Sequence, residues 1–453
     1  MTGLLARTGA AMLALALAVA PAAAETLADA MAFGYENSGA LEQNRALLRV
    51  ADERVASAVA GLRPIVNWAA QVQGRYNSVA GAQPLEATLG LTASVVLWDG
   101  GRGALGVDIQ REAVLATRQG LIQAEQQILL RIVQAYAGVR REQSFVDLRE
   151  NNVRLITEQM RAAQDRFDVG EVTRTDVAQA EARLAAARSL LAAEQGNLAM
   201  ARAEYEAAVG RRPGSLAPMP AAPLRQSRDE ALAWAMRNHP AILQAQHSVA
   251  ASELAVEVAS RANRPQVTLQ GQIGTTWDFD GYSESVTLGV GGPVYQGGLL
   301  ASKVRQAMAQ RDADRAALLT AAQTVTQNVT NAWARRDMAR AQAQALERQV
   351  QAAQSAFDGL NEEAALGART TLDVLNAEQE LLDARANLIS AQVDETVASY
   401  GLLSALGLLT AQNLGLNVQI YDPEAYYRMV EHAPAALSEQ GQALDRVLRA
   451  IGE

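Results

Sequence analysis

The chain is 453 residues long, and its composition already narrows the classes of protein to which it can belong. Hydrophobic residues make up 49% of it but aromatic residues only 4%, so its apolar side chains are mostly Ala, Leu and Val, as in long, closely packed helices. With 49 acidic against 40 basic residues, the formal net charge of -9 offers nucleic acid no attraction. The absence of cysteine excludes disulfides, thiolate metal sites and an acyl chain on cysteine.

The first 24 residues are predicted to be a signal peptide. Arg7 precedes an apolar run from Ala10 to Ala20, and Ala22 to Ala24 have the small-x-small form of a signal peptidase site. A membrane anchor is the alternative, but the run is shorter than the roughly 20 residues that a spanning helix needs. We therefore expect cleavage after Ala24 and export of the remaining chain.

The exported chain is predicted to contain two related halves, residues 25–210 and 227–416. Four prolines fall in the segment 211–226, which therefore reads as a linker, and residues 417–453 form a C-terminal periplasmic tail. At a constant spacing the second half repeats residues of the first, and this similarity indicates an internal duplication. The matched pairs include Gly170 and Gly367, Thr173 and Thr370, Asp176 and Asp373, and Glu181 and Glu378.

Each half is predicted to contain a helix, two strands, a long helix, a tight turn and a second long helix. The segments from 102 to about 165 and from 299 to about 362 are rich in strong helix formers and have no interior proline. Roughly 60 helical residues make a rod of about 90 Å, which no compact single domain needs.

The turns between the long helices, near 166–175 and 363–372, carry the same motif twice. A glycine ends the first helix, and a threonine three residues before an aspartate has the pattern of a capping box that starts the next. Each motif therefore predicts the tip of a helical hairpin. The threonines and aspartates either only satisfy helix-start N–H groups or have a second role as well. The residues concerned are Gly170, Thr173 and Asp176, and Gly367, Thr370 and Asp373.

Four segments, 64–77, 85–98, 265–279 and 283–295, are predicted to be strands with one apolar and one small or polar face. A soluble sheet packed on helices would show the same alternation. These strands, however, exceed the 9 to 11 residues that cross a bilayer, and Trp98, Trp277 and Tyr295 lie near strand ends, as in outer-membrane proteins. Because four strands cannot close a barrel, we expect several copies to contribute to one barrel.

The motifs VVLWDGGR (Val95 to Arg102) and GPVYQGG (Gly292 to Gly298), together with the two hairpin motifs, resemble the TolC family of outer-membrane efflux and secretion channels. The resemblance extends from about Leu27 to Leu416. It implies a mixed α and β fold and a homotrimer, in which a 12-stranded outer-membrane barrel continues as a periplasmic α-helical barrel. It also implies a channel-tunnel that receives substrates from a periplasmic adaptor and an inner-membrane transporter.

The resemblance also assigns residues to the periplasmic aperture. Asp373 matches an aspartate that forms a ring of three carboxylates, and such a ring favours cations and makes the entrance sensitive to pH. Arg369 matches an arginine that bonds across hairpins, with Thr175 and Asp176 as its partners. The chain departs from the family pattern at Asn376, where some members have a second aspartate. It departs again at Ala364, where some have a gating tyrosine.

The hairpin tips are expected to dock to the adaptor through Gly170, Thr173, Gly367 and Thr370. In the tail, VQIYDPEAYYRMVEHAP (Val418 to Pro434) resembles members that work in type I secretion, where an ABC transporter exports a protein. A poorly ordered tail without such a role is the alternative interpretation. Drug efflux likewise remains an alternative to protein secretion.

Enzymatic activity has no support in the sequence. His239, His247 and His432 lack the spacing of metal ligands, and neither a phosphate-binding loop nor a nucleophile is recognisable, so no cofactor or metal is expected. The pairs Gly100-Gly101 and Gly297-Gly298 are interpreted as strand-to-helix turns. A periplasmic adaptor or coiled-coil scaffold is the alternative from another class, although an adaptor typically has one hairpin between β-domains.

Overall fold

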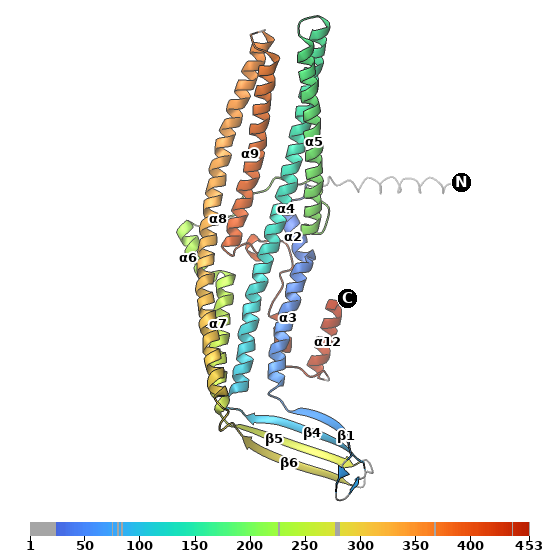
Figure 1. Cartoon of the computed structure of the whole chain (residues 1–453), viewed down its shortest axis with the longest axis vertical. Helices are drawn as coiled ribbons and strands as arrows, with labels where there is room; N and C mark the ends of the chain where they lie inside the picture. Colours follow the sequence, from blue (N-terminus) through green and yellow to red (C-terminus); the bar gives the residue numbers. More distant parts are fainter. Residues whose placement is uncertain are drawn as a thin grey trace, which may run out of the picture. The chain divides into compact units, whose positions relative to one another are not determined.

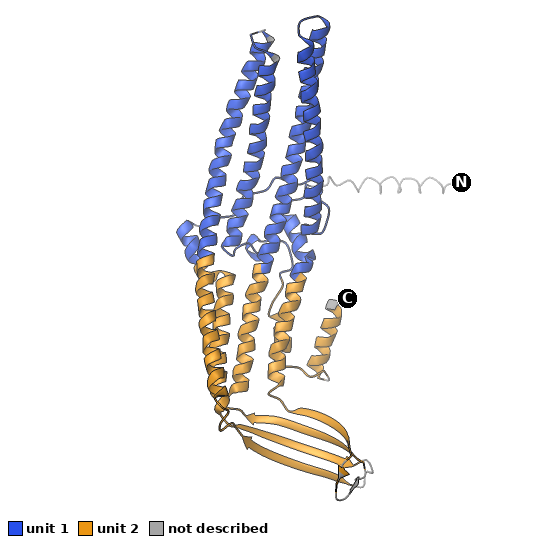
Figure 2. Ribbon diagram, viewed as in Figure 1, with its two compact units in different colours: residues 1–41, 124–235, 325–420 blue, residues 42–123, 236–324, 421–453 orange. Residues whose placement is uncertain are grey.

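The computed structural model describes residues 24–452, except 75, 79–80, 83–84, 225–226, 277–280, 367 and 437. Most of the predicted signal peptide, together with Trp277 and Gly367, therefore lies outside the described residues. Figure 1 shows the order of the elements, and Figure 2 shows two compact units. Unit 1 contains Ala124–Ala235, Val325–Ile420 and the chain before Glu42, and unit 2 contains Glu42–Gln123, Met236–Thr324 and the chain from Tyr421. Each unit thus takes segments from both halves of the duplication.

The helix predicted at the start of each half is two helices in the structure. The first half has α2 (Leu27–Asn37) and α3 (Gly39–Ala60), and the second has α6 (Arg228–Asn238) and α7 (Pro240–Ser260), which a short 3-10 turn (Arg261–Asn263) extends. The break at His239 follows from Pro240, because a residue before proline avoids the helical conformation. The break at Ser38 has extended backbone, and the Ser38 hydroxyl accepts a hydrogen bond from Leu41 N–H at the start of α3.

The long helices of the two hairpins extend slightly beyond the predicted ranges. In the first half α4 (Arg102–Asp168) is followed by α5 (Arg174–Val209), and in the second α8 (Leu299–Ala365) is followed by α9 (Thr371–Ala405). A short helix, α10 (Ala411–Leu414), follows α9. Among the described residues no helix has the length and the hydropathy that crossing a membrane requires.

Unit 2 contains an antiparallel sheet in the order β1 (Ile65–Gln73), β4 (Glu86–Trp98), β5 (Gln266–Thr276) and β6 (Tyr282–Gly291). The first predicted strand ends early, because its last residues form β2 (Tyr76–Asn77), which pairs separately with β3 (Gly81–Ala82). The last predicted strand ends at Gly291 rather than 295, since Pro293 has no N–H with which to continue the ladder.

The register of the sheet places mostly polar residues on one face and mostly apolar residues on the other. One row of directly opposed residues is polar throughout: Asn67, Thr92, Gln272 and Ser285. The next row, on the other face, is apolar: Val66, Ala93, Gly271 and Val286. The alternation predicted for separate strands is therefore aligned between neighbours, and Glu284, opposite Ile273, is a charged exception on the mostly apolar face.

Glycine pairs make the turns from strand to long helix. Gly100 and Gly101, between β4 and α4, have φ of 74° and 83°, a region that side chains disfavour. The Asp99 carboxylate then accepts hydrogen bonds from the N–H groups of Gly101 (2.9 Å) and Gly103 (2.6 Å), at the start of α4. Gly297 and Gly298 repeat the positive φ before α8, which confirms the interpretation of both pairs as turns.

The C-terminal tail is ordered and packs on α3. Its helices are α11 (Ala425–Val430) and α12 (Glu439–Gly452). Tyr426 and Val430 form a buried cluster with Ala56 of α3, and the Tyr426 hydroxyl donates a hydrogen bond of 2.6 Å to the Glu53 carboxylate. The interpretation of this tail as poorly ordered is therefore wrong for the described residues that form these helices.

In unit 1, Glu25 joins the N-terminal segment to the base of the first hairpin. The Tyr205 hydroxyl donates a hydrogen bond of 2.6 Å to the Glu25 carboxylate, which also pairs with Arg211 at 2.7 Å. The Tyr136 hydroxyl, fully buried beside Tyr205, lies 2.8 Å from the backbone carbonyl of Glu25. Burial, as the leading cause, raises the pKa of Tyr136 to about 12, so this hydroxyl stays protonated.

Candidate functional site

The tip of the first hairpin has the geometry that its sequence predicts. Gly170 ends α4 with φ of 81°, and its N–H donates to the Phe167 carbonyl at 2.9 Å. Thr173 and Asp176 then form a complete capping box at the start of α5. Thr173 N–H and hydroxyl donate to Asp176 Oδ2 at 2.9 and 2.8 Å, and Asp176 N–H donates to the Thr173 hydroxyl at 3.4 Å.

The tip of the second hairpin is capped in the same way. Thr370 N–H and hydroxyl donate to Asp373 Oδ2 at 3.1 and 2.8 Å, and Asp373 N–H donates to the Thr370 hydroxyl at 3.3 Å. The structure therefore brings together both predicted threonine–aspartate pairs. Gly367, the predicted helix-ending glycine of this tip, lies outside the described residues.

Both tip aspartates are held in the charged form. The Thr173 N–H, followed by its hydroxyl, lowers the pKa of Asp176 below its ordinary value. The Thr370 hydroxyl, followed by its N–H, does the same for Asp373, and Arg369 adds a small lowering. Capping thus favours the ionised form of both carboxylates.

Arg369 bonds within its own hairpin in the single chain. Its guanidinium Nε lies 2.8 Å from Glu363 Oε2, and both side chains are half exposed. Within the described part of one chain, no hydrogen bond joins Arg369 to Thr175 or Asp176. The predicted link of Arg369 across hairpins remains a prediction.

Two residues of α9 connect the second hairpin to the first. Asn376, exposed, accepts a hydrogen bond of 2.9 Å from the Arg183 guanidinium of α5. Glu378, only 5% exposed, accepts bonds from the side-chain amides of Asn152 (3.1 Å) and Gln159 (2.8 Å), both on α4. Sequence reasoning matched Glu378 to Glu181 but missed its role, because the repeat does not reveal which of the two is buried.

A cavity of about 180 Å³ lies between the two hairpins near their tips. Gln159 and Arg166 line it from α4, Asp176 from α5, Ala364 from α8 and Val374 from α9. Ala364 is the position where the family resemblance expects a tyrosine in some members. The small side chain thus borders open space, and the hairpins are not closely packed at this level.

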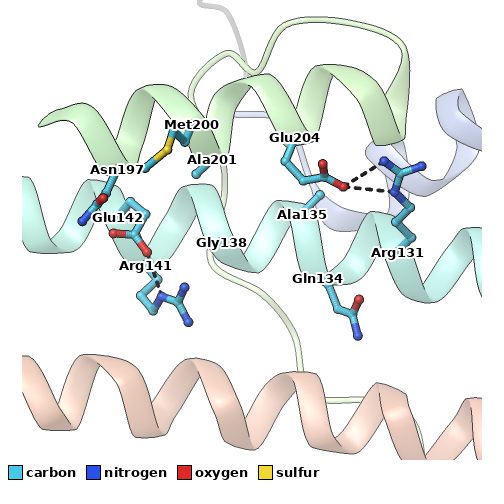
Figure 3. A pocket seen from close by; sticks show the side chains of 10 residues that line it. All are labelled: Arg131, Gln134, Ala135, Gly138, Arg141, Glu142, Asn197, Met200, Ala201 and Glu204. Atoms are coloured by element: carbon cyan, nitrogen blue, oxygen red, sulfur yellow. Dashed lines mark hydrogen bonds and ion pairs between the residues drawn. The ribbon is translucent and has the colours of Figure 1, made fainter. Parts of the chain in front are cut away.

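A second hollow, of about 430 Å³, runs along α4 and α5 nearer the base of the first hairpin (Figure 3). Small residues such as Ala135, Gly138 and Ala201 line it. Arg131 and Glu204 face each other at 3.0 Å beside it, and their charges are paired. No group of His, Cys, Asp and Glu in the described chain is arranged to hold a metal ion.

Comparison with known proteins identifies the family. The family model "Outer membrane efflux protein" matches residues 35–211 and again 232–408, once in each half of the duplication. The chain belongs to the outer membrane efflux protein family. This membership confirms the predicted resemblance and the duplicated, mixed α and β fold. It also makes the chain an outer-membrane protein that extends into the periplasm, as predicted.

Relatives of this outer membrane efflux protein match from two thirds to nine tenths of its length. It is 37% identical over 422 residues to the outer membrane efflux protein BepC of Brucella suis, covering 90% of this chain and 91% of that protein. It is 26% identical to the alkaline protease secretion protein AprF of Pseudomonas aeruginosa, covering 67% and 68%. The Campylobacter jejuni CmeC outer membrane channel has the same fold, with a TM-score of 0.76 and 15% identity over 90% of each chain.

Proposed function

We propose that this protein is a channel-tunnel that passes substrates from an inner-membrane transporter and its adaptor across the periplasm and the outer membrane. The observation that carries the proposal is the sheet, in which β1 and β6 are both open edges. Backbone groups at an open edge are not tolerated in lipid, so the sheet must be completed by other strands. Its apolar face suits lipid, and its polar face suits a water-filled lumen.

Three copies complete the barrel in this proposal. Pairing of β6 in one copy with β1 in the next gives a closed sheet of about 12 strands, and even-numbered barrels of this size are ordinary in outer membranes. The hairpins of the three copies then form the periplasmic tunnel. Energy for transport comes from the inner-membrane partner, because the family to which the chain belongs consists of channels.

The experiment that tests the channel combines size and conductance. We expect the full chain, extracted from outer membranes in detergent, to have the protein mass of a trimer by light scattering and to form ion-conducting pores in planar lipid bilayers. A detergent-independent monomer without conductance would contradict the channel and support the periplasmic adaptor or scaffold.

At the tips, the proposal places the aperture at Asp373, Arg369, Asp176, Thr175 and Asn376. Asp373 from each copy contributes to a ring of carboxylates, and Arg369 links hairpins of neighbouring copies through Thr175 and Asp176. The exposed turn residues Gly170 and Thr173, with Gly367 and Thr370, face the adaptor. The capping boxes support this role, because they fix the position of each carboxylate on a rigid helix start.

For the cargo, we favour protein secretion with an ABC transporter, supported by the secretion-like tail and by the similarity to AprF. Drug efflux is the second candidate, favoured by the higher identity to BepC, which is named an efflux protein. Deletion of the gene separates the two. Loss of a protein from the culture medium supports secretion, whereas increased sensitivity to toxic compounds with an unchanged secreted set supports efflux.

A further inference from the structure

The first hairpin is held together by apolar clusters, and polar bonds join the second hairpin to it. Inside it, α4 and α5 pack through buried apolar residues: Ile156, Leu184 and Ala187 form one cluster, and Ala163, Val177 and Ala180 another. Between the hairpins, α9 reaches α4 and α5 through polar bonds from Glu378 and Asn376. Apolar contacts lose their stabilisation when separated in water, whereas hydrogen bonds exchange for water at low net cost.

The Glu378 carboxylate of α9 forms a two-point contact with α4, which we call the Glu378 bridge. Asn152 and Gln159 lie two turns apart on the same face of α4, and each amide donates to a different oxygen of the Glu378 carboxylate. A carboxylate only accepts hydrogen bonds, so two amide donors match its two oxygens. Arg183 of α5 adds attraction from a third helix.

The hydrogen bonds of Glu378 are buried or partly buried, so moving α9 away from α4 would break them and expose the carboxylate to water. Glu378 and Asn152 are both nearly inaccessible to solvent. Burial raises the pKa of Glu378, while the two amides and Arg183 lower it in part. Toward the tip, Gln159 also borders the cavity of about 180 Å³, so packed side chains do not continue the contact there. The carboxylate therefore provides two polar contacts between the hairpins at this level, one buried and one partly buried.

We propose that Glu378 is a positioning residue that holds the second hairpin against the first through Asn152 and Gln159, and that the channel mouth opens by breaking this bridge. The inference rests on the proposed channel function and names the contact within each copy that resists opening. It differs from the links between copies, because both partners belong to one chain. Water replaces the amide donors when α9 moves away from α4.

The internal duplication supplies a matched control for a test. Glu181 occupies the position in α5 that Glu378 occupies in α9, but its side chain is exposed. We expect Glu378→Ala to raise the open-to-closed ratio of single channels in planar bilayers by about tenfold, the effect of losing one or two hydrogen bonds. Glu181→Ala should conduct like the unaltered channel. Glu378→Gln should remain mostly closed, because the amide oxygen still accepts one bond and the amides of Asn152 and Gln159 can reverse.

A cross-link tests the same contact when Glu378→Ala does not assemble. Because the chain has no cysteine, the double variant Asn152→Cys with Glu378→Cys introduces the only thiols. A short bifunctional maleimide that joins them should hold the channel in its low-conductance state. A monofunctional maleimide at both thiols should leave it able to open.

Two results would overturn the inference alone: conductance of Glu378→Ala equal to that of Glu181→Ala in assembled channels, or cross-linked channels that open as often as uncross-linked ones. A complete lack of conductance from the unaltered protein would overturn the proposed channel, and the inference with it. The two failures are therefore distinguishable in the same bilayer recordings.

Discussion

The two hairpins are nearly identical at their tips but differ two turns further along the second helix of each. Both tips have the same threonine–aspartate capping box, with the same three hydrogen bonds. Below them, Glu181 of α5 is exposed, whereas Glu378 of α9 is buried against α4. A cap depends only on residues within one turn and is copied when a segment is duplicated. A lateral contact depends on the neighbouring helix, which differs between the halves.

The largest effect on stability is expected at Glu378. Glu378→Ala removes the acceptor for two amide donors, one of them on the buried Asn152, and should lower the free energy of unfolding by about 2 kcal/mol. Glu181→Ala should leave it unchanged, because that side chain is exposed. Thermal unfolding of the detergent-extracted protein measures the stability of both variants. Equal decreases in stability for Glu378→Ala and Glu181→Ala would contradict the proposed difference between the hairpins.

The same pair predicts a difference in pH dependence. A carboxyl whose pKa is raised by folding binds its proton more tightly in the folded state than in the unfolded state. Its contribution to stability therefore increases as pH falls through the raised pKa and is lost as pH rises above it. Glu378→Gln should remove this contribution, flattening the unfolding temperature as a function of pH, whereas Glu181→Gln should leave the profile unchanged.

The capping boxes are expected to have intermediate and equal effects. Thr173→Ala and Thr370→Ala each remove a hydroxyl that both accepts from and donates to the aspartate, and each should cost about 1 kcal/mol. Serine at either position should restore most of the loss, because it keeps the hydroxyl. Helix content of each variant during thermal unfolding provides the measurement. If only one of the two threonine variants lowered the unfolding temperature, the two capping boxes would not be equivalent.

The sequence was sufficient to predict features that depend on local chemistry. Glycine and threonine motifs located both hairpin turns, and strand alternation located the sheet with its apolar and polar faces. Where local chemistry was overlooked, the prediction failed: Pro240 breaks the helix before it, and Pro293 stops β6 at Gly291. Both features were visible in the sequence.

Contacts between distant segments were not predictable in this way. Glu378 lies in an ordinary amphipathic pattern, and nothing local indicates that Asn152 and Gln159, more than 200 positions earlier, donate to it. The tail likewise gave no signal that Tyr426 would reach Glu53 of α3. A single sequence contains the apolar and polar pattern of each helix, but it does not indicate which helix faces contact each other.

Asp373 should affect selectivity more than stability. Asp373→Asn keeps an oxygen that accepts the Thr370 bonds but removes the charge, so cation preference in planar bilayers should decrease with little change in unfolding temperature. Capping lowers the pKa of Asp373. The ionised carboxylate therefore contributes its full stabilisation above its ordinary pKa, and this stabilisation is lost as pH falls through the lowered pKa. Asp176→Asn removes the other capped carboxylate of the aperture and gives the comparison between the two tips. Equal loss of cation preference in both variants would contradict a special role for the second tip.

The smallest effect on the isolated chain is expected at Arg369, and it separates a contact within a hairpin from one between copies. The ion pair with Glu363 is half exposed, and such pairs contribute little because water solvates both charges. Arg369→Ala should therefore leave the unfolding temperature unchanged. If Arg369 also bonds to a neighbouring copy, the variant should nevertheless open more often in bilayers, and Glu363→Ala should not. Identical recordings from both variants would restrict Arg369 to its own hairpin and leave Glu378 as the contact that holds the mouth closed.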